Sequence, residues 1–229
     1  MRVRGGTGND SLYGEDGDDT VIGGAGNDRL FGYTRDPFLY GAIDLDGGGD
    51  RIQIADSASL DIAGDLTVEA WIRLDGAQPQ FSTIVAKGDW GYQLRLSASE
   101  PGAVEFISGT PGTGVLGLAT ISTTHLDSGV WYHVAGVVEG GEQRLYIDGQ
   151  LESTTVRGTT AVDTNASGLW IGANDEMPGR DFNGAIADVR VWGTARSAAQ
   201  IADYSHSRLV GDEAGLAGNW VLDSAFGPY

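Results

Sequence analysis

Residues 66–74 read Leu-Thr-Val-Glu-Ala-Trp-Ile-Arg-Leu, a strict alternation of two kinds of side chain. One side of this run is apolar and carries Leu66, Val68, Ala70, Ile72 and Leu74. The other side carries Thr67, Glu69, Trp71 and Arg73. Because successive side chains of a β-strand point to opposite faces, the pattern predicts a half-buried strand with its aliphatic face in a core.

Further runs of this kind follow from about Leu39 onward, at a spacing typical of β-sandwiches. They are residues 130–138, 144–151, 168–172 and 185–192. Asp148-Gly149 predicts a type I′ hairpin turn, because both residue types tolerate positive φ. One short helix is predicted after Ser197, since Ser197 and Gln200 have the spacing of a capping box and Ile201 begins a narrow apolar face.

These motifs follow one another between residues 43 and 220, and in that order they resemble the bacterial laminin G-like domains of the concanavalin A-like jelly-roll family. The motifs that carry the resemblance are Ile43-Asp-Leu-Asp-Gly47, Leu66-Thr-Val-Glu-Ala-Trp-Ile72, Trp131-Tyr-His-Val-Ala135, Leu145-Tyr-Ile-Asp-Gly149 and Phe182-Asn-Gly-Ala-Ile-Ala-Asp-Val-Arg-Val-Trp192. The resemblance implies two antiparallel sheets and a role in binding glycans or protein surfaces. We therefore expect an all-β fold, an antiparallel β-sandwich of the jelly-roll type.

The start of the chain consists of three consecutive nonapeptides, residues 5–13, 14–22 and 23–31. Each has Gly at its first and fourth positions, an aliphatic residue at its eighth and Asp at its sixth, which gives Asp10, Asp19 and Asp28. Glycines permit turns with positive φ and expose carbonyl oxygens, while Asp adds a charged oxygen ligand of the kind calcium prefers. The spacing therefore predicts a calcium-binding segment.

The repeats resemble the repeats-in-toxin (RTX) nonapeptide, which forms a calcium-binding parallel β-roll with two nonapeptides to a coil. The resemblance implies that the first and third copies stack and share one Ca²⁺ ion between Asp10 and Asp28, with Asp19 on the opposite side. The full set of implied metal ligands is Gly5, Thr7, Asp10, Asp19, Gly24, Gly26 and Asp28. Residues 32–40 have lost the pattern, so we expect one well-formed site.

A flexible acidic linker is the alternative interpretation of the repeats, because a Gly/Asp-rich segment has little apolar surface to offset its ordering entropy. Each of the two interpretations can apply under different conditions, the linker without calcium and the β-roll with it. The acidic side chains that accompany Arg29 in the repeats are Asp10, Glu15, Asp16, Asp18, Asp19 and Asp28. These groups repel one another until calcium neutralises them, so we expect disorder without the ion and a β-roll with it.

We expect two domains, the repeats in residues 1–35 and the jelly roll in residues 36–229. Lys and Arg number 14 against 32 Asp and Glu, and the formal net charge of −18 excludes polyanions such as nucleic acid as partners. Cysteine is absent, which excludes disulfides, thiolate metal sites and a cysteine nucleophile. No stretch is long and apolar enough to span a bilayer. We expect a fragment of a larger exported protein whose export signal lies outside this sequence.

The laminin G-like resemblance also implies a calcium ion at the rim of the sandwich, where the first and last strands meet. The matching residues are Asp46, Gly48 and Asp50 in one turn, with Asp188 on a late strand. Oxygen ligands at a turn suit calcium. The alternatives are that residues 46–50 form only a tight glycine turn and that Asp188 pairs with Arg51 or Arg190.

Two loops offer candidate ligand-binding residues. Trp90 is flanked by glycines in Lys87-Gly-Asp-Trp-Gly91, and residues 172–181 contain Asn174, Asp175, Glu176 and Arg180. Sugars are held by stacking on aromatic rings and by hydrogen bonds from polar side chains, so either loop is a candidate binding rim. The alternatives are that Trp90 caps the edge of a sheet and that the loop carboxylates are only solvated.

We expect no catalytic activity. No Glu is followed by Asp two positions later, so the Glu-x-Asp-x-x-Glu pattern of jelly rolls that hydrolyse β-glucans is absent. His125, His133 and His206 lack the spacing of a zinc site. Asp36-Pro37 is a candidate for the calcium-triggered self-cleavage of some RTX proteins, but the sequence that follows it favours a binding domain.

These observations lead to one hypothesis: a calcium-binding, non-catalytic recognition or adhesion module of a large secreted RTX protein. We expect a monomeric extracellular module, exported by a type I system, that binds Ca²⁺ and a glycan in the manner of a lectin, a protein surface being the second choice of ligand. It is not expected to bind nucleic acid or to insert into membranes. The alternatives are a structural spacer of an adhesin and an accessory domain of a secreted hydrolase or protease.

Overall fold

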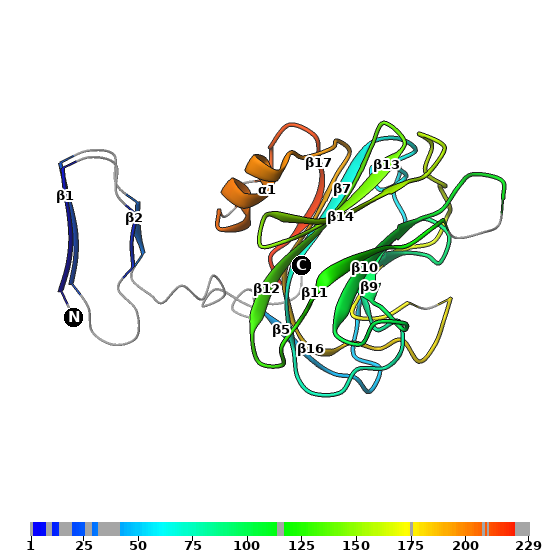
Figure 1. Ribbon diagram of the computed structural model, residues 1–229, viewed down its shortest axis with the longest axis horizontal. Helices are drawn as coiled ribbons and strands as arrows, with labels where there is room; N and C mark the ends of the chain where they lie inside the picture. The colour runs from blue at the N-terminus through cyan, green and yellow to red at the C-terminus, as the bar shows by residue number, and fades with distance from the viewer. Residues whose placement is uncertain are drawn as a thin grey trace. The chain divides into compact units, whose positions relative to one another are not determined.

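The chain divides into two compact units, Met1–Gly41 and Ala42–Tyr229 (Figure 1). The computed structural model describes residues 2–7, 11–13, 20–25, 29–31, 42–113, 117–174, 176–207, 209 and 211–222. The predicted domain boundary after residue 35 and the candidate cleavage site Asp36-Pro37 lie outside the described residues.

The described residues of the first unit form four short strands, β1 (Arg2–Thr7), β2 (Ser11–Tyr13), β3 (Thr20–Ala25) and β4 (Arg29–Phe31). β1 pairs with β3 and β2 pairs with β4, both in parallel. Every paired residue lies 18 positions from its partner, as in Val3 with Val21 and Leu12 with Leu30. This offset is the length of two nonapeptides, so the pairing agrees with a coil of two repeats in which the first and third copies stack.

The second unit is a sandwich of two antiparallel sheets. The six-stranded sheet has the order β11-β10-β9-β8-β15-β6, and the seven-stranded sheet has the order β14-β13-β12-β7-β16-β17, with β5 also beside β16. Strands of the first sheet are β6 (Ile52–Ile54), β8 (Thr83–Lys87), β9 (Tyr92–Leu96), β10 (Ala103–Ser108), β11 (Thr120–His125) and β15 (Leu169–Ile171). Strands of the second are β5 (Ile43–Asp46), β7 (Leu66–Leu74), β12 (Trp131–Glu139), β13 (Glu142–Ile147), β14 (Gln150–Val156), β16 (Asn183–Trp192) and β17 (Leu216–Trp220). The predicted all-β sandwich is confirmed.

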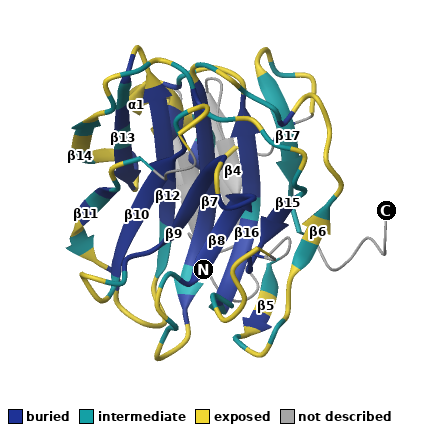
Figure 2. Ribbon diagram, turned by 90° about the vertical axis from the view of Figure 1, so that its right-hand side faces the viewer, coloured by how far each residue is buried: buried dark blue, intermediate teal, exposed yellow. Residues whose placement is uncertain are grey.

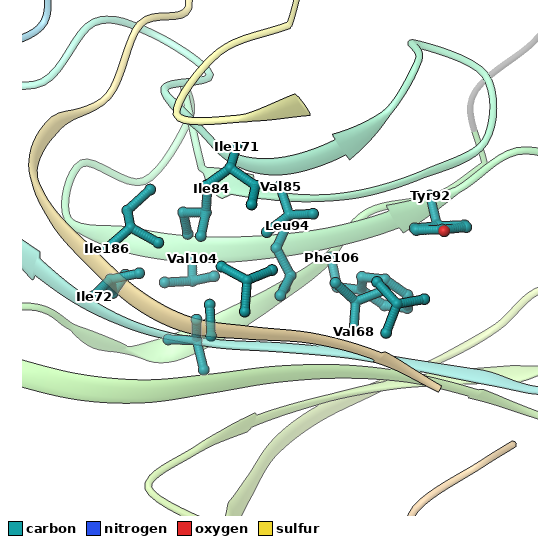
Figure 3. Close-up of a cluster of buried hydrophobic side chains, with 14 of the residues drawn as sticks. Val68, Ile72, Ile84, Val85, Tyr92, Leu94, Val104, Phe106, Ile171 and Ile186 are labelled. Carbon is teal, nitrogen blue, oxygen red and sulfur yellow. The ribbon is translucent and has the colours of Figure 1, made fainter. Parts of the chain in front are cut away.

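The core lies between the two sheets, where aliphatic and aromatic side chains meet (Figure 3). The labelled residues are Val68, Ile72, Ile84, Val85, Tyr92, Leu94, Val104, Phe106, Ile171 and Ile186, and all are buried. The central strands are buried along most of their length, whereas the outer strands β5, β6, β11, β14 and β17 carry intermediate and exposed residues (Figure 2). The rigid part of the sandwich is therefore its centre, from which the connecting loops project.

Two local sequence signals correctly predicted a hairpin turn and the start of a helix. The hairpin between β13 and β14 turns at Asp148 and Gly149, which have φ of 49° and 74°, the two positive values that a type I′ turn requires. The helix α1 (Ala198–Ser205) begins after Ser197, whose side chain accepts a hydrogen bond from the Gln200 amide while the Gln200 side chain accepts one from the Ser197 amide.

The prediction that β7 is half-buried was wrong, because its second face is also covered. Segment 194–207, which includes α1, lies over the outside of the seven-stranded sheet. Trp71 Nε1 donates to the Ser205 carbonyl at 2.8 Å, and Thr67 Oγ1 donates to the Thr194 carbonyl at 2.9 Å. Ile201 of α1 packs against Ala135 and its neighbours on the same face. Period-two patterning identified the strand, but a covering segment that lies more than 120 residues later in the chain leaves no local signal.

No helix among the described residues combines the length and the apolar character that crossing a bilayer requires.

Candidate functional site

Trp90 lies in the tight turn that joins β8 to β9, and 40% of its surface is exposed. Gly88 has φ of 61°, and an added Cβ there would stand 2.8 Å from the Ser167 side chain. Glycine thus lets the turn pack closely against the segment before β15. The turn presents a large aromatic ring to solvent on a rigid support.

The side chain of Asp89 joins this turn to the loop of residues 172–181. Asp89 is buried, and its Oδ1 accepts hydrogen bonds from Arg180 Nη1 at 3.0 Å and Asn174 Nδ2 at 3.2 Å. Gln93 on β9 also donates to Asp89 Oδ1, at 3.2 Å. Burial lowers the pKa of Arg180, and the charge of Asp89 acts in the opposite direction. The guanidinium therefore pairs with a carboxylate of its own chain.

Glu176 makes a second link between the same two loops. Its Oε2 accepts a hydrogen bond from the Asp89 amide at 2.7 Å, and its Oε1 accepts one from the Ser167 hydroxyl. Both carboxylate oxygens are thus bonded although the residue is exposed. The Glu176 amide in turn donates to Asn174 Oδ1 at 3.2 Å.

A third segment, which contains Gly109, packs against the backbone of Trp90 and Gly91. The Gly109 amide donates to the Gly91 carbonyl at 2.7 Å, and a Cβ on Gly109 would stand 1.8 Å from the Trp90 carbonyl oxygen. The Gly109 carbonyl accepts hydrogen bonds from the Asp163 amide and from Arg157 Nη2, at 3.1 and 2.9 Å. We call the turn 88–91 together with segments 109–113, 161–167 and 172–181 the rim.

The structure thus joins the two loops that the sequence offered as separate candidates. Asn174, Glu176 and Arg180 all bond to the turn that carries Trp90 or to its support, whereas Asp175 lies outside the described residues. Sequence reasoning missed Asp89, which is the junction of the rim. Its only local signal was its place between glycine and tryptophan, since its loop partners Asn174 and Arg180 lie more than 80 residues away.

The turn at residues 46–50 is held by hydrogen bonds from its own backbone. The Gly48 amide donates to Asp46 Oδ1 at 2.7 Å, and the Asp46 amide donates to Asp50 Oδ2 at 3.3 Å. Asp188 is not brought to this turn, because Asp46 pairs with Asn183, five residues earlier on β16. Asp188 instead accepts a hydrogen bond from Arg190 Nε at 3.0 Å, as the alternative interpretation expected. Within the described part of the chain, no group of three or more acidic or histidine side chains has the arrangement of a metal site.

The candidate ligands of the repeats are described only in part. Gly5 and Thr7 lie on β1 and Gly24 lies on β3, and these two strands pair directly, as in Gly6 with Gly24. Asp10, Asp19, Gly26 and Asp28 lie outside the described residues. The strand pairing is the one that a calcium-binding coil of two nonapeptides requires. The pairing also begins at Arg2, which precedes the first full nonapeptide and lies within the repeat domain predicted for residues 1–35.

Two family models match the sequence. Residues 46–202 match Laminin_G_3, described as the concanavalin A-like lectin/glucanases superfamily, and residues 2–32 match the RTX calcium-binding nonapeptide repeat. No curated protein matches the chain.

Solved structures share the fold at low sequence identity. A candidate carbohydrate-binding protein from Bacteroides ovatus aligns with a TM-score of 0.68 and 21% identity, over 86% of this chain and 54% of that one. This chain therefore spans about half the length of that protein. Domain 4 of the extracellular arabinanase AbnA from Geobacillus stearothermophilus, in complex with arabinotriose, aligns with a TM-score of 0.54 and 22% identity over 71% and 75% of the two chains. The CBM40 of the Ruminococcus gnavus IT-sialidase, bound to α2,3-sialyllactose, has a TM-score of 0.54 and 13% identity over 71% and 97%.

Proposed function

The chain belongs to the concanavalin A-like lectin/glucanases superfamily and carries RTX calcium-binding repeats, and we propose that it is a non-catalytic module of a secreted protein that binds carbohydrate at the rim. The observation that carries the proposal is the exposed ring of Trp90 on a turn that three other loops hold in place. An aromatic face that is already ordered stacks on a sugar ring at low entropic cost. The structures with bound oligosaccharides share this fold and support the choice of ligand class.

The electrostatics of the rim favour a neutral oligosaccharide over an acidic one. The basic side chains in or directly beside its described segments are Lys87, Arg157 and Arg180, and each is bonded to oxygen atoms of the chain itself. A sugar carboxylate would find no unpaired cation there and would meet a chain of net charge −18. Hydroxyl groups of a neutral sugar need only hydrogen-bonding partners, which the loop carbonyls and the Glu176 carboxylate supply.

Calcium enters the proposal through the repeats. When bound, calcium would neutralise the negative charges of Asp10 and Asp28, and the repeat unit would then complete its folding. A type I export route fits this order of events, because repeats that stay unfolded at low calcium would fold only outside the cell. The turn with Asp46, Gly48 and Asp50 remains a second candidate calcium site.

A glycan array followed by titration calorimetry tests the proposal. The chain is expected to retain neutral oligosaccharides more strongly than sialylated ones. Trp90→Ala should weaken the best ligand by about tenfold or more, equal to about 1.4 kcal/mol, because it removes the stacking face. Leu151→Ala is the matched control, since Leu151 is 55% exposed on β14 and lies outside the rim. Wild-type affinity in Trp90→Ala would overturn the proposal.

A role as an accessory domain of a secreted glycoside hydrolase is the more specific alternative. The arabinanase domain and the sialidase CBM40 are themselves parts of hydrolases, and both share this fold. The sequence of the full-length parent protein tests this alternative, which requires a catalytic domain in the same chain.

A further inference from the structure

Lys87 is the only lysine in the sequence, and it is 1% exposed. It is the last residue of β8, directly before the turn that carries Trp90. Lysine is almost never fully buried unless its ammonium group is paired. The ammonium group of Lys87 must therefore be paired inside the protein, directly beside the candidate ligand site.

Four oxygen atoms from two distant segments surround the Lys87 ammonium. Nζ donates to Asp56 Oδ1 at 2.8 Å, to the Asn165 carbonyl at 2.8 Å and to the Ser167 carbonyl at 2.6 Å. Asp61 Oδ1 lies 3.0 Å away and is paired through charge alone, without a hydrogen bond. The three N–H groups of the ammonium thus have one acceptor each, and two carboxylates balance its charge.

This set of atoms is the kind that proteins use to bind a metal ion. Two carboxylates and two backbone carbonyls from surface loops are hard oxygen ligands, such as calcium takes at 2.3–2.6 Å. Here Lys87, at the end of β8, places its positive charge at the centre of these four oxygen atoms, which we call the cage. An ammonium tied to a strand needs no ion from solution, so the cage forms whenever the sandwich folds.

The cage is connected to Trp90 by a short series of hydrogen bonds. The Ser167 carbonyl accepts a hydrogen bond from Lys87 and the Ser167 hydroxyl donates one to Glu176, whose carboxylate also accepts one from the Asp89 amide. The Asn165 carbonyl accepts a hydrogen bond from the Lys87 ammonium, and Asn165 Nδ2 donates one to the Lys87 carbonyl at 3.1 Å. Moving the ammonium would therefore shift segment 161–167 and, through Glu176, the backbone beside Trp90.

We propose that Lys87 is a built-in cation that positions the rim, so that the ligand site of the sandwich forms without calcium while the repeats depend on it. Lys87 is a positioning residue, because it acts on Trp90 through Ser167 and Glu176. Its connection to ligand binding rests on the proposed function, but its action on the rim can be measured without any ligand.

Hydrogen–deuterium exchange of the full chain, with and without calcium, tests the proposal. In the wild-type chain, backbone amides of residues 88–91 and 163–168 should exchange slowly, at rates that a calcium chelator leaves unchanged. Lys87→Ala, which leaves the cage without its cation, should speed exchange in both segments by about tenfold or more. Added Ca²⁺ should restore part of that protection in Lys87→Ala, because the oxygen ligands remain, and this rescue separates a positioning cation from a packing defect.

Arg144→Gln is the matched control, because it removes a cation from an exposed pair outside the rim and should leave exchange in the rim unchanged. If Lys87→Ala does not fold, Asp61→Asn takes its place and should speed exchange in the same segments. Acetylation of the wild-type chain gives an independent measurement, in which Lys87 should react far more slowly than the terminal amine. Rim protection that a chelator abolishes, exchange unchanged in the variants or rapid acetylation of Lys87 would each overturn the proposal. Failure of Trp90→Ala to weaken glycan binding would overturn only the proposed function.

Discussion

In residues 5–31, six acidic side chains are accompanied by a single basic one, Arg29. In the sandwich, by contrast, the buried carboxylates of Glu69, Asp89 and Glu105 each lie within 3.6 Å of an arginine nitrogen. Asp56 and Asp61 share Lys87 in the same way. The acidic groups of the repeat unit thus far outnumber its basic ones, whereas the buried carboxylates of the sandwich are paired with cations of the same chain.

The difference follows from how each unit brings its residues together. The repeats pair strands only 18 residues apart and have little apolar surface, so we expect their stability to depend on bound calcium. The sandwich joins segments more than 100 residues apart around one hydrophobic core. A core of that size can hold charged pairs in fixed positions, so we expect the folding of the sandwich not to depend on calcium.

The largest effect is expected at the Arg95–Glu105 pair on the outer face of the six-stranded sheet. Arg95 Nε donates to Glu105 Oε1 at 2.6 Å, and both side chains are buried. Arg95→Met would leave Glu105 charged and unpaired, which should lower the free energy of unfolding by about 3–5 kcal/mol in chemical denaturation. The loss should be the same with and without calcium.

Two further variants serve as controls for this measurement. Arg95→Met combined with Glu105→Leu removes both charges and should recover most of the loss. Arg144→Gln breaks the exposed pair with Glu139 and should cost less than about 1 kcal/mol. If the loss of unfolding free energy in Arg95→Met depended on calcium, the contrast between the two units would be contradicted.

A smaller effect is expected from acid, through His133 on β12. Burial, aided by the charges of Arg190 and His206, lowers the pKa of His133 to about 3. The unfolded chain takes up this proton near the ordinary value of 6.5 and the folded chain does not, so stability is lost as the pH falls below about 6.5. By pH 5 the loss from this group should reach about 2 kcal/mol.

Glu69 faces His133 at 3.7 Å, and burial raises the pKa of its carboxyl, which changes stability in the opposite direction. Asp148, whose pKa burial also raises, accepts a hydrogen bond from the His133 amide. The contribution of His133 is therefore the difference between the wild-type chain and His133→Gln. The stability of the wild-type chain relative to His133→Gln, measured by denaturation from pH 7 to pH 5, should fall toward acid. A constant difference would show that His133 does not titrate in this range.

Local patterns predicted the strands β7, β12, β13, β15 and β16, but not β8, β9, β10 or β11 of the six-stranded sheet. Period-two alternation located β7, the dipeptide Asp148-Gly149 located a hairpin, and the capping box at Ser197 located α1. Each of these signals lies within a few residues of the element that it specifies. The cover over the outer face of β7 could not be predicted, because it depends on where segment 194–207 returns after the sheet has formed.

The candidate ligand site was predicted only as separate pieces. Trp90 and the loop of residues 172–181 were recognised by their residue types, but their union depends on Asp89, whose partners Asn174 and Arg180 are distant in sequence. Asp188 was grouped with the turn at Asp46 from a resemblance, whereas the strand register places it five residues beyond the partner of Asp46. Composition alone held one unused signal, the single lysine at position 87.

The most direct test of the contrast between the two units is a calcium titration of the ¹⁵N-labelled full chain, followed by NMR. Amide resonances of residues 2–31 should move from unfolded to dispersed positions as Ca²⁺ is added. Those of the sandwich, apart from the turn at Asp46–Asp50, should stay in place. Repeat resonances that are already dispersed in the presence of a chelator, or sandwich resonances that become dispersed only with calcium, would contradict the account.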